Sequence, residues 1–508
     1  MMKALQDGNR AKCDRPMPST LSPTIDVCTL GKSFNLSSHI HRRPVQRLID
    51  IGDPGVKGLC FEQALLPEGW AYGVRILVAG GIIASIEIGR AAEPGDERHR
   101  IGLPGICNLH SHAFQRGMAG LAEIKGTSAD SFWTWRELMY RFVGRMTPDD
   151  IEAVAAQAYV EMLEAGFTRV GEFHYIHHDV SGAPYANPAE LAERIVTAAE
   201  ATGIGLTLLP VFYAHAGFGG RAPEAGQRRF VNNIDEFTRL HEASRRALAG
   251  FQGAVIGVAP HSLRAVTPME LAALESLAGS EPVHIHIAEQ TREVDECIAW
   301  SGQRPLEWLF DHAAVDRKWC LVHATHASIA EIGSIAKSGS VAGLCPVTEA
   351  NLGDGTFKAP EFIERGGAIG VGSDSNVLIG VSDELRQLEY SQRLALRARN
   401  VMASGSAAST GRALFDGALR GGAQALGLRS AGLVEGGFAD IVSLNAQSAT
   451  LAARRGDAIL DSWVFGASRS LVDCVWARGR KMVQAGRHYG GEAIAERFRR
   501  ALESLLET

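Results

Sequence analysis

The chain has 508 residues, of which 46% are hydrophobic and 21% charged, so it is long enough to bury a large core and has the composition of a globular protein. Its net charge of −6 gives no general attraction for phosphate backbones, which argues against nucleic acid as a partner. No apolar run approaches the roughly 20 residues that cross a bilayer, and the amino terminus lacks an apolar signal core, so we expect a cytoplasmic protein without membrane contact.

The two ends of the chain are predicted to build a small domain together. Residues 1–57 mix Ser, Thr, Pro, Arg and Asp without a sustained period, and we expect a flexible N-terminal extension there, with native translation starting near Val56 as one interpretation. Strand-like runs follow, with a hairpin turn at Gly80-Gly81, and similar runs return late in the chain. We therefore predict one small β-sheet domain from residues 58–103 and 432–488, followed by a C-terminal surface helix at 489–508.

Residues 104–431 alternate strand-like runs with amphipathic segments, the pattern of a parallel sheet with helices outside it. The fold class is therefore α/β, a (β/α)8 TIM-type barrel. Its eight strands are predicted at residues 106–112, 168–174, 205–212, 255–260, 283–288, 320–323, 341–345 and 369–372. Helices are expected at residues 149–164, 188–202, 234–248, 268–277 and 383–399. Two of them should start with a capping residue and a proline, at Asn187-Pro188 and Thr267-Pro268.

Five residues of types that commonly bind metal ions stand at the carboxyl ends of predicted strands. In a β/α barrel the active site lies at these strand ends. They are His110, His112, His286, His323 and Asp374. Because His110 and His112 are two apart on a strand, they face the same side and can bind one ion together. Three histidines and one carboxylate would suit zinc and leave one position open for water. The eight cysteines include no Cys-x-x-Cys pair, so we expect neither a disulfide framework nor a thiolate site.

The fifth strand offers two histidines, His284 and His286, and spacing alone does not choose between them. Glu289 stands just beyond the strand, where it could reach the same pocket as a proton carrier, so we select His286 as the ligand and place His284 deeper. The fourth strand ends at Pro260-His261 and supplies no lysine to bridge a second ion. We therefore expect a single metal ion.

From about Leu59 to about His488, these motifs resemble the amidohydrolase superfamily, whose members share a distorted (β/α)8 barrel and a β-sandwich made from both termini. The strand-one His-x-His, strand-five His-x-x-Glu, strand-six His and strand-eight Ser-Asp are similar to those of the mononuclear aminohydrolases, which remove ammonia from C=N carbons. More narrowly, residues 110–116 followed by 132–140 resemble the formimidoylglutamate deiminase family of histidine degradation.

The resemblance implies a role for each matching residue. One Zn2+ per chain would be held by His110, His112, His286 and Asp374. Glu289 and His323 fall on the two proton-handling positions of the family, and Asp374 would also accept a proton. Positions that resemble substrate contacts are Gln115, Arg136, Tyr175, His261 and Arg264. Asn376, in the strand-eight loop, matches no contact, and the long leader before Leu59 is not expected in the family.

The implied reaction is the hydrolysis of N-formimidoyl-L-glutamate to N-formyl-L-glutamate and ammonia. Its substrate is a small dicarboxylate, and an arginine fork binds a carboxylate in a fixed plane, so Arg136 and Arg264 are the expected carboxylate partners. Phe132, Trp133 and Trp135 are interpreted as wall and packing residues. We expect a homodimer.

Three other functions compete with this one. A guanine or cytosine deaminase on the same barrel would need stacking and amide contacts more than two arginines. A two-metal cyclic-amide hydrolase is disfavoured by the missing strand-four lysine. A non-catalytic barrel would be expected to lose Glu289, His323 or Asp374, and all three are present.

Overall fold

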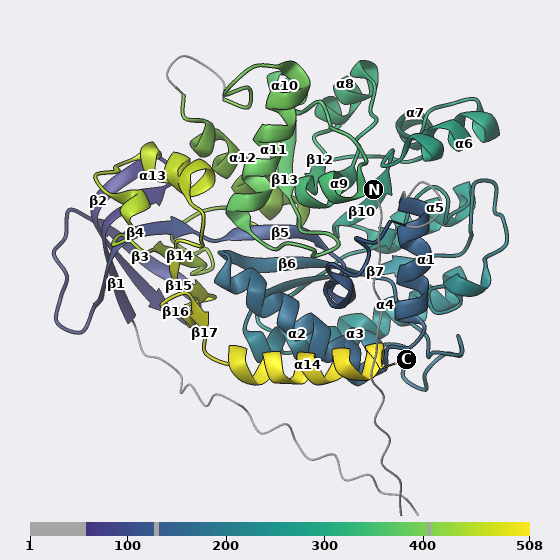
Figure 1. Cartoon of the computed structure of the whole chain (residues 1–508), viewed down its shortest axis with the longest axis horizontal. Helices are drawn as coiled ribbons and strands as arrows, with labels where there is room; N and C mark the ends of the chain where they lie inside the picture. The colour runs from purple at the N-terminus through teal and green to yellow at the C-terminus, as the bar shows by residue number, and fades with distance from the viewer. Residues whose placement is uncertain (1–56, 126–131, 404–407, 508) are drawn as a thin grey trace, which may run out of the picture. The chain divides into compact units, whose positions relative to one another are not determined.

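The computed structural model describes residues 57–125, 132–403 and 408–507, and residue contacts divide the chain into residues 1–48 and 49–508 (Figure 1). The predicted extension at residues 1–57 therefore lies outside the described residues, apart from Lys57. The side chains of Phe132 and Trp133 also lie outside them, so their predicted packing is not tested. Among the described residues, no helix combines the length and the apolar character that crossing a bilayer requires.

Strands from both ends of the described chain form one eight-stranded sheet. In spatial order they are β17 (Arg487–His488), β16 (Arg480–Gln484), β15 (Val472–Ala477), β14 (Ile441–Leu444), β4 (Glu97–Pro104), β1 (Lys57–Leu66), β2 (Gly69–Ala79) and β3 (Ile82–Ile88). Antiparallel pairing of β14 with β4 joins the two ends, as the sequence predicted. The predicted hairpin turn is also confirmed, because Gly80 and Gly81 connect β2 to β3 with φ of 56° and 84°.

The middle of the chain supplies two sheets of parallel strands. Their strands are β5 (Ile106–Ser111), β6 (Phe167–His174), β7 (Gly205–Phe212), β8 (Val255–Ile256), β9 (Ala259–Pro260), β10 (Val283–Ile287), β11 (Trp319–His323), β12 (Val341–Leu344) and β13 (Ala368–Val371). All eight predicted strands occur, with the fourth divided into β8 and β9. Parallel bridges between Val258 and Val283, and between Ser111 and Asp374, connect the two sheets. This arrangement is consistent with a TIM barrel.

Helices lie between the parallel strands and at the end of the chain (Figure 1). They are α1 (Phe132–Val143), α2 (Pro148–Glu164), α3 (Glu190–Thr202), α4 (Ile234–Ala247), α5 (Pro268–Ala278), α6 (Thr291–Ser301), α7 (Pro305–His312), α8 (Ile329–Ser338), α9 (Pro346–Leu352), α10 (Ala359–Glu364), α11 (Val381–Leu396), α12 (Thr410–Ala425), α13 (Asp457–Asp461) and α14 (Gly491–Leu506). Short helical turns are η1 (Ala113–Met118), η2 (Ala225–Gln227), η3 (Ala449–Leu451) and η4 (Ser462–Gly466).

One of the two predicted helix starts is confirmed and the other is wrong. Thr267 caps α5, since its side chain accepts a hydrogen bond from the backbone N–H of Glu270. In contrast, α3 begins at Glu190 rather than at Pro188. The side chain of Asn187 accepts from the backbone N–H of Ala189 at 3.1 Å, and this local turn uses the asparagine before the helix begins.

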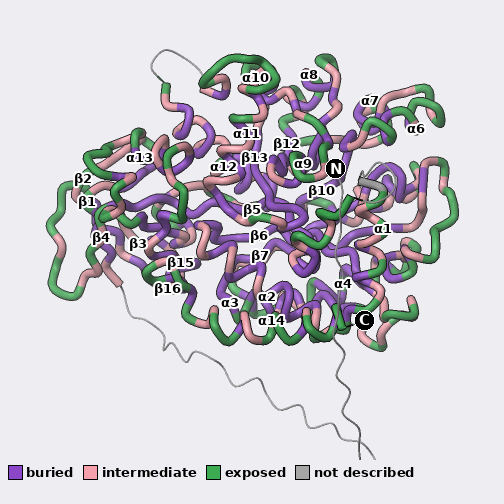
Figure 2. Tube along the Cα trace, in the orientation of Figure 1, coloured by how far each residue is buried: buried purple, intermediate pink, exposed green. Residues whose placement is uncertain are grey.

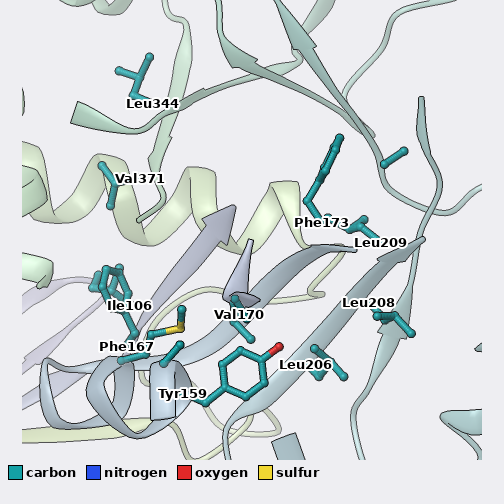
Figure 3. Packing of buried hydrophobic residues seen from close by; sticks show 14 of the residues in the cluster. Ile106, Tyr159, Phe167, Val170, Phe173, Leu206, Leu208, Leu209, Leu344 and Val371 are labelled. Atoms are coloured by element: carbon teal, nitrogen blue, oxygen red, sulfur yellow. The ribbon is translucent and has the colours of Figure 1, made fainter. Parts of the chain in front are cut away.

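The core is centred on the parallel strands. Every residue of β5, β6, β7, β10 and β11 is buried, as expected for strands covered on both faces, and Figure 2 shows buried residues along the strands and exposed ones on the outer helices. In Figure 3, Tyr159 of α2 lies near Phe167 and Val170 of β6 within this core. Because these strands are parallel and packed in one core, their carboxyl ends lie close together, and so can the side chains at those ends.

Candidate metal centre and catalytic cavity

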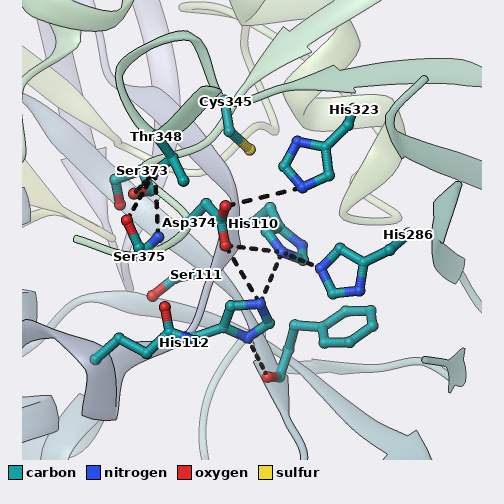
Figure 4. Close-up of polar contacts among 12 residues, drawn as sticks. His110, Ser111, His112, His286, His323, Cys345, Thr348, Ser373, Asp374 and Ser375 are labelled. Carbon is teal, nitrogen blue, oxygen red and sulfur yellow. Dashed lines mark hydrogen bonds and ion pairs between the residues drawn. The ribbon is translucent and has the colours of Figure 1, made fainter. Parts of the chain in front are cut away.

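Three histidines and one aspartate from three separate strand ends meet at a single point. His110 is in β5, His112 follows it directly, His286 is in β10, and Asp374 follows β13. Their side chains are all buried, and one nitrogen or oxygen atom from each lies within 4.8 Å of the others. Figure 4 shows the imidazoles turned toward the carboxylate of Asp374. His284, by comparison, lies outside this cluster and bonds the carbonyl oxygen of Ala425 through Nε2 at 2.8 Å.

The spacing of these atoms matches a tetrahedral metal site. His110 Nε2 lies 3.0 Å from His286 Nε2 and 3.3 Å from His112 Nε2. Asp374 Oδ1 lies 3.5 Å from His110 Nε2 and 3.3 Å from His112 Nε2. Ligand nitrogens bound at about 2.0–2.1 Å to a tetrahedral zinc ion are about 3.3–3.4 Å apart. The donor set therefore fits one zinc-sized ion.

The protonation of the imidazoles supports the same conclusion. Nδ1 of His112 lies 3.0 Å from the carbonyl oxygen of Phe173, and Nδ1 of His286 lies 3.0 Å from that of His261. A carbonyl only accepts, so each Nδ1 carries the proton and each Nε2 presents a lone pair. Burial lowers the pKa of all three histidines, to about 3 for His110, so they are neutral. Converging lone pairs beside a carboxylate are held together best by a cation.

Unusual backbone geometry is concentrated around the cluster. Five non-glycine residues there have positive φ: Ala288, His323, Ala324, Asp374 and Asn376, with values from 43° to 67°. Non-glycine residues rarely adopt a positive φ, because this backbone conformation costs about 1–3 kcal/mol per residue. Such backbone strain is typical of functional sites. The strand ends are thus bent to aim these side chains.

Asn376 holds two of these strand ends together. Its Nδ2 donates to the carbonyl oxygens of His112 at 3.1 Å and Asp374 at 3.0 Å, and to Ser111 Oγ at 3.2 Å. Its Oδ1 accepts from Ser373 Oγ at 2.6 Å. The asparagine that matched no family contact is therefore a fully buried clamp between β5 and β13, and the structure gives it no contact with the cavity.

Glu289 and His323 stand beside the cluster without belonging to its four-atom group. His323 Nε2 lies 3.9 Å from Glu289 Oε1 and 3.8 Å from Asp374 Oδ2, while its Nδ1 lies 3.2 Å from Glu349 Oε1. Burial lowers the pKa of His323, but the surrounding carboxylates outweigh burial and raise it to about 10. Burial raises the pKa of Glu289 above its ordinary value, and the positive charges of His323 and Arg264 oppose this. A carboxyl that holds its proton near neutral pH suits acid–base work.

These residues line a cavity with about 680 Å3 of empty space, open mouth included. All five predicted substrate contacts line it: Gln115, Arg136, Tyr175, His261 and Arg264. So do His112, His286, Glu289, His323 and Asp374. Trp135, expected as a wall residue, also lines it, whereas His110 is fully buried behind the cavity wall.

The cavity walls contain residues that the sequence did not indicate. Tyr140 of α1, Tyr213 directly after β7, and Phe230 line the cavity. Tyr213 could have been found by its place at the end of a predicted strand. Glu349, which bonds His323, was not recognisable, because an acidic residue in the first turn of a helix usually faces solvent.

Two family matches together cover most of the chain. Residues 101–482 match the Amidohydrolase family, and residues 61–100 match the family described as formimidoylglutamate deiminase HutF, N-terminal domain. The first match contains the parallel strands and every residue of the metal cluster.

Individual relatives agree with these matches. The chain is 52% identical to a formimidoylglutamate deiminase of Pseudomonas aeruginosa over 448 residues, which cover 88% of this chain and 99% of the relative. It is 27% identical to a 5-methylthioadenosine/S-adenosylhomocysteine deaminase of Natronomonas pharaonis, over 68% of this chain and 74% of that one. A solved amidohydrolase of Brucella melitensis has 60% identity and a TM-score of 0.87, with 89% of this chain and all of that one covered.

Proposed function

The chain belongs to the amidohydrolase family, and from that membership we propose that it hydrolyses N-formimidoyl-L-glutamate to N-formyl-L-glutamate and ammonia in histidine degradation. A formimidoylglutamate deiminase that is 52% identical and matched over 99% of its length supports this substrate. The observation that carries the proposal is structural. A three-histidine, one-aspartate cluster lies at the wall of one cavity, which a buried glutamate and two arginines suited to a dicarboxylate also line.

We propose that one zinc ion per chain is held by His110, His112, His286 and Asp374. When bound, zinc lowers the pKa of a coordinated water from 15.7 towards about 7, which supplies a nucleophile at neutral pH. The neutral imidazoles and the ionised aspartate support this choice, because zinc prefers imidazole nitrogen and carboxylate oxygen.

The remaining chemistry is assigned to three side chains. The water oxygen bonds to the formimidoyl carbon, the bond from that carbon to the terminal nitrogen breaks, and ammonia leaves. Asp374 accepts the proton of the attacking water, and Glu289 delivers a proton to the departing nitrogen. His323, held by Glu349, hydrogen-bonds the attacking water and the oxygen of the tetrahedral carbon.

The two substrate carboxylates are assigned to Arg136 and Arg264, with Gln115, Tyr175 and His261 completing the pocket. Gln115 Nε2 donates to Tyr175 Oη at 3.0 Å, which orients the phenol at the cavity wall. Replacing either arginine by alanine should raise KM for formimidoylglutamate, by about 10-fold or more for a charge-assisted bond. Unchanged KM values in both variants would remove both arginines from substrate binding.

For the architecture, we propose that the parallel strands close into a (β/α)8 barrel at residues 104–431. The β domain at residues 58–103 and 432–488 would form a sandwich, followed by a C-terminal helix at 489–508. We propose a homodimer in the cytoplasm. The bridges at both sheet edges support barrel closure.

Ammonia release from the zinc-loaded protein tests the function directly. Formimidoylglutamate, guanine, cytosine and hydantoin would be compared as substrates under the same conditions. We expect kcat/KM for formimidoylglutamate to exceed the others by orders of magnitude, since a pocket with two arginines suits a dicarboxylate. A preference for guanine or cytosine would refute the proposal in favour of a nucleobase deaminase.

A further inference from the structure

A buried glutamine outside the catalytic cavity controls two tyrosines that line it. Gln227, in η2, is fully buried. Its Nε2 donates to Tyr213 Oη at 2.7 Å and to Tyr140 Oη at 3.4 Å. Its Oε1 accepts from the backbone N–H of Glu224 at 2.7 Å. Because a backbone N–H can only donate, this bond fixes which end of the amide faces the tyrosines.

The orientation of the amide determines the orientation of the hydroxyls. An NH2 group only donates, so both tyrosine oxygens accept from Gln227 and their own protons must point elsewhere. Both residues line the cavity, so these O–H groups are available to whatever occupies that part of it. Gln227 thus keeps hydrogen-bond donors directed at the cavity.

The surroundings of these donors are positively charged. Arg136 and Arg264 line the same cavity as the two tyrosines, and their charges lower the pKa of Tyr213 against the larger effect of burial, which raises it. Arg136 also lies over the ring of Tyr140, with Cζ 5.5 Å from the ring centre. A directed O–H beside guanidinium groups is suited to a carboxylate.

The position in the cavity indicates which carboxylate. In formimidoylglutamate the α-carboxylate lies close to the reacting carbon, and the distal carboxylate lies two methylenes further out. Arg264 follows Ser262, which forms a parallel bridge with the metal-cluster residue His286. Arg136 and Tyr140 instead lie on α1, which carries none of the metal-cluster residues. The distal carboxylate therefore belongs at the α1 side.

We propose that Gln227 is a positioning residue for recognition of the distal carboxylate, which the oriented tyrosine pair binds beside Arg136. This inference rests on the proposed function, since it names the part of that substrate which the pair recognises. It also gives the cavity a means of selecting glutamate derivatives over amidines without a distal acid.

Gln227→Glu tests the inference with almost no change of shape. One carboxylate oxygen can still accept from Glu224, but the other must now accept from a tyrosine, which reverses the hydroxyls so that a lone pair faces the cavity. We expect KM for formimidoylglutamate to rise about 10-fold or more, with kcat within about threefold of wild type. N-formimidoyl-L-2-aminobutyrate lacks only the distal carboxylate, and its kcat/KM should be unchanged.

Gln392→Glu is the matched control. Gln392 is also buried and donates through Nε2 to the carbonyl oxygen of Phe357 at 2.9 Å, but it does not line the cavity. This variant should keep wild-type KM for both substrates, and thermal melting would report the stability of each variant. An unchanged KM for formimidoylglutamate in Gln227→Glu, or an equal loss on both substrates, would overturn the inference.

Tyr140→Phe is a second test of the inference, and it removes only the hydroxyl oxygen of one tyrosine. It should raise KM for formimidoylglutamate, and adding Gln227→Glu should then raise KM by less than it does in the wild-type background, because part of its effect passes through the Tyr140 hydroxyl. If the two substitutions raised KM by fully additive amounts, Gln227 would not act through the Tyr140 hydroxyl. A wild-type protein that released no ammonia from formimidoylglutamate would refute the proposed function instead. Calorimetry with N-formyl-L-glutamate would then decide this inference: weaker binding by Gln227→Glu supports it, and equal or absent binding overturns it.

Discussion

Replacing Glu289 by glutamine should remove most turnover and leave the metal in place. The side chain is only 5% exposed, and its backbone N–H donates to Glu293 Oε2 at 3.1 Å, so the substitution leaves the main chain held as before. Glu289 is outside the four-residue metal cluster, so zinc content should not fall. A glutamine in the same space has no acidic proton to give to the departing nitrogen.

The size of the effect follows from that lost proton. A positioned acid or base contributes about 10²–10⁴-fold to rate, which corresponds to about 2.7–5.5 kcal/mol of barrier. We expect kcat from ammonia release to fall by that factor while zinc per chain, measured by atomic absorption, stays at the wild-type value. Glu296→Gln, on the helix α6 that begins two residues after Glu289, is the control and should behave as wild type. Near-normal turnover with zinc bound, or loss of zinc in step with turnover, would refute the assigned role.

Three further predictions concern the metal and its support. Chelation should abolish activity and lower the free energy of unfolding by about 2.7 kcal/mol relative to zinc at 100 times its Kd, as measured by urea unfolding, and added zinc should reverse both effects. Asn376→Ala should cost about 3–5 kcal/mol, because it removes four buried hydrogen bonds; a loss below about 1 kcal/mol would contradict the clamp. Burial raises the pKa of Glu172 from 4.5 to about 8, so between these values the folded chain holds a proton that the unfolded chain lacks. The stability of wild type relative to Glu172→Gln should therefore fall, by on the order of 3–5 kcal/mol, as the pH of urea unfolding rises from about 5 to about 9; a constant difference would exclude this titration.

The parallel strands were predictable because their residues are buried on both faces. Such strands are continuous apolar runs, and β7 begins and ends at the predicted residues, Gly205 and Phe212. The metal cluster could be predicted for a related reason. Ligands in this fold follow the strand ends, so correctly predicted strands place His286 and Asp374 close together, as the structure has them.

Other features were not predictable because they depend on partners far away in the chain. β4 contains Arg98, His99 and Arg100, and its first half has no apolar run; it is a strand because β1 and β14 pair with it on either side. The clamp by Asn376 likewise needs Ser111 and His112, more than 260 residues earlier in the sequence. Spacing along the chain contains no signal for such contacts.

A recurring device holds the strand ends around the cavity. Glu172 accepts from the backbone N–H of Ala113 after β5, Glu293 from that of Ala288 after β10, and Glu349 from that of Cys345 after β12. Each is a buried carboxyl that satisfies a backbone N–H just beyond the end of a strand. A glutamate has the reach to do this from a neighbouring strand or helix, and it can bond a second group as well, as Glu349 does with His323. The acidic residues around the cavity therefore divide into those that move protons and those that hold the backbone, and their hydrogen-bond partners distinguish the two groups more reliably than their distance from the metal.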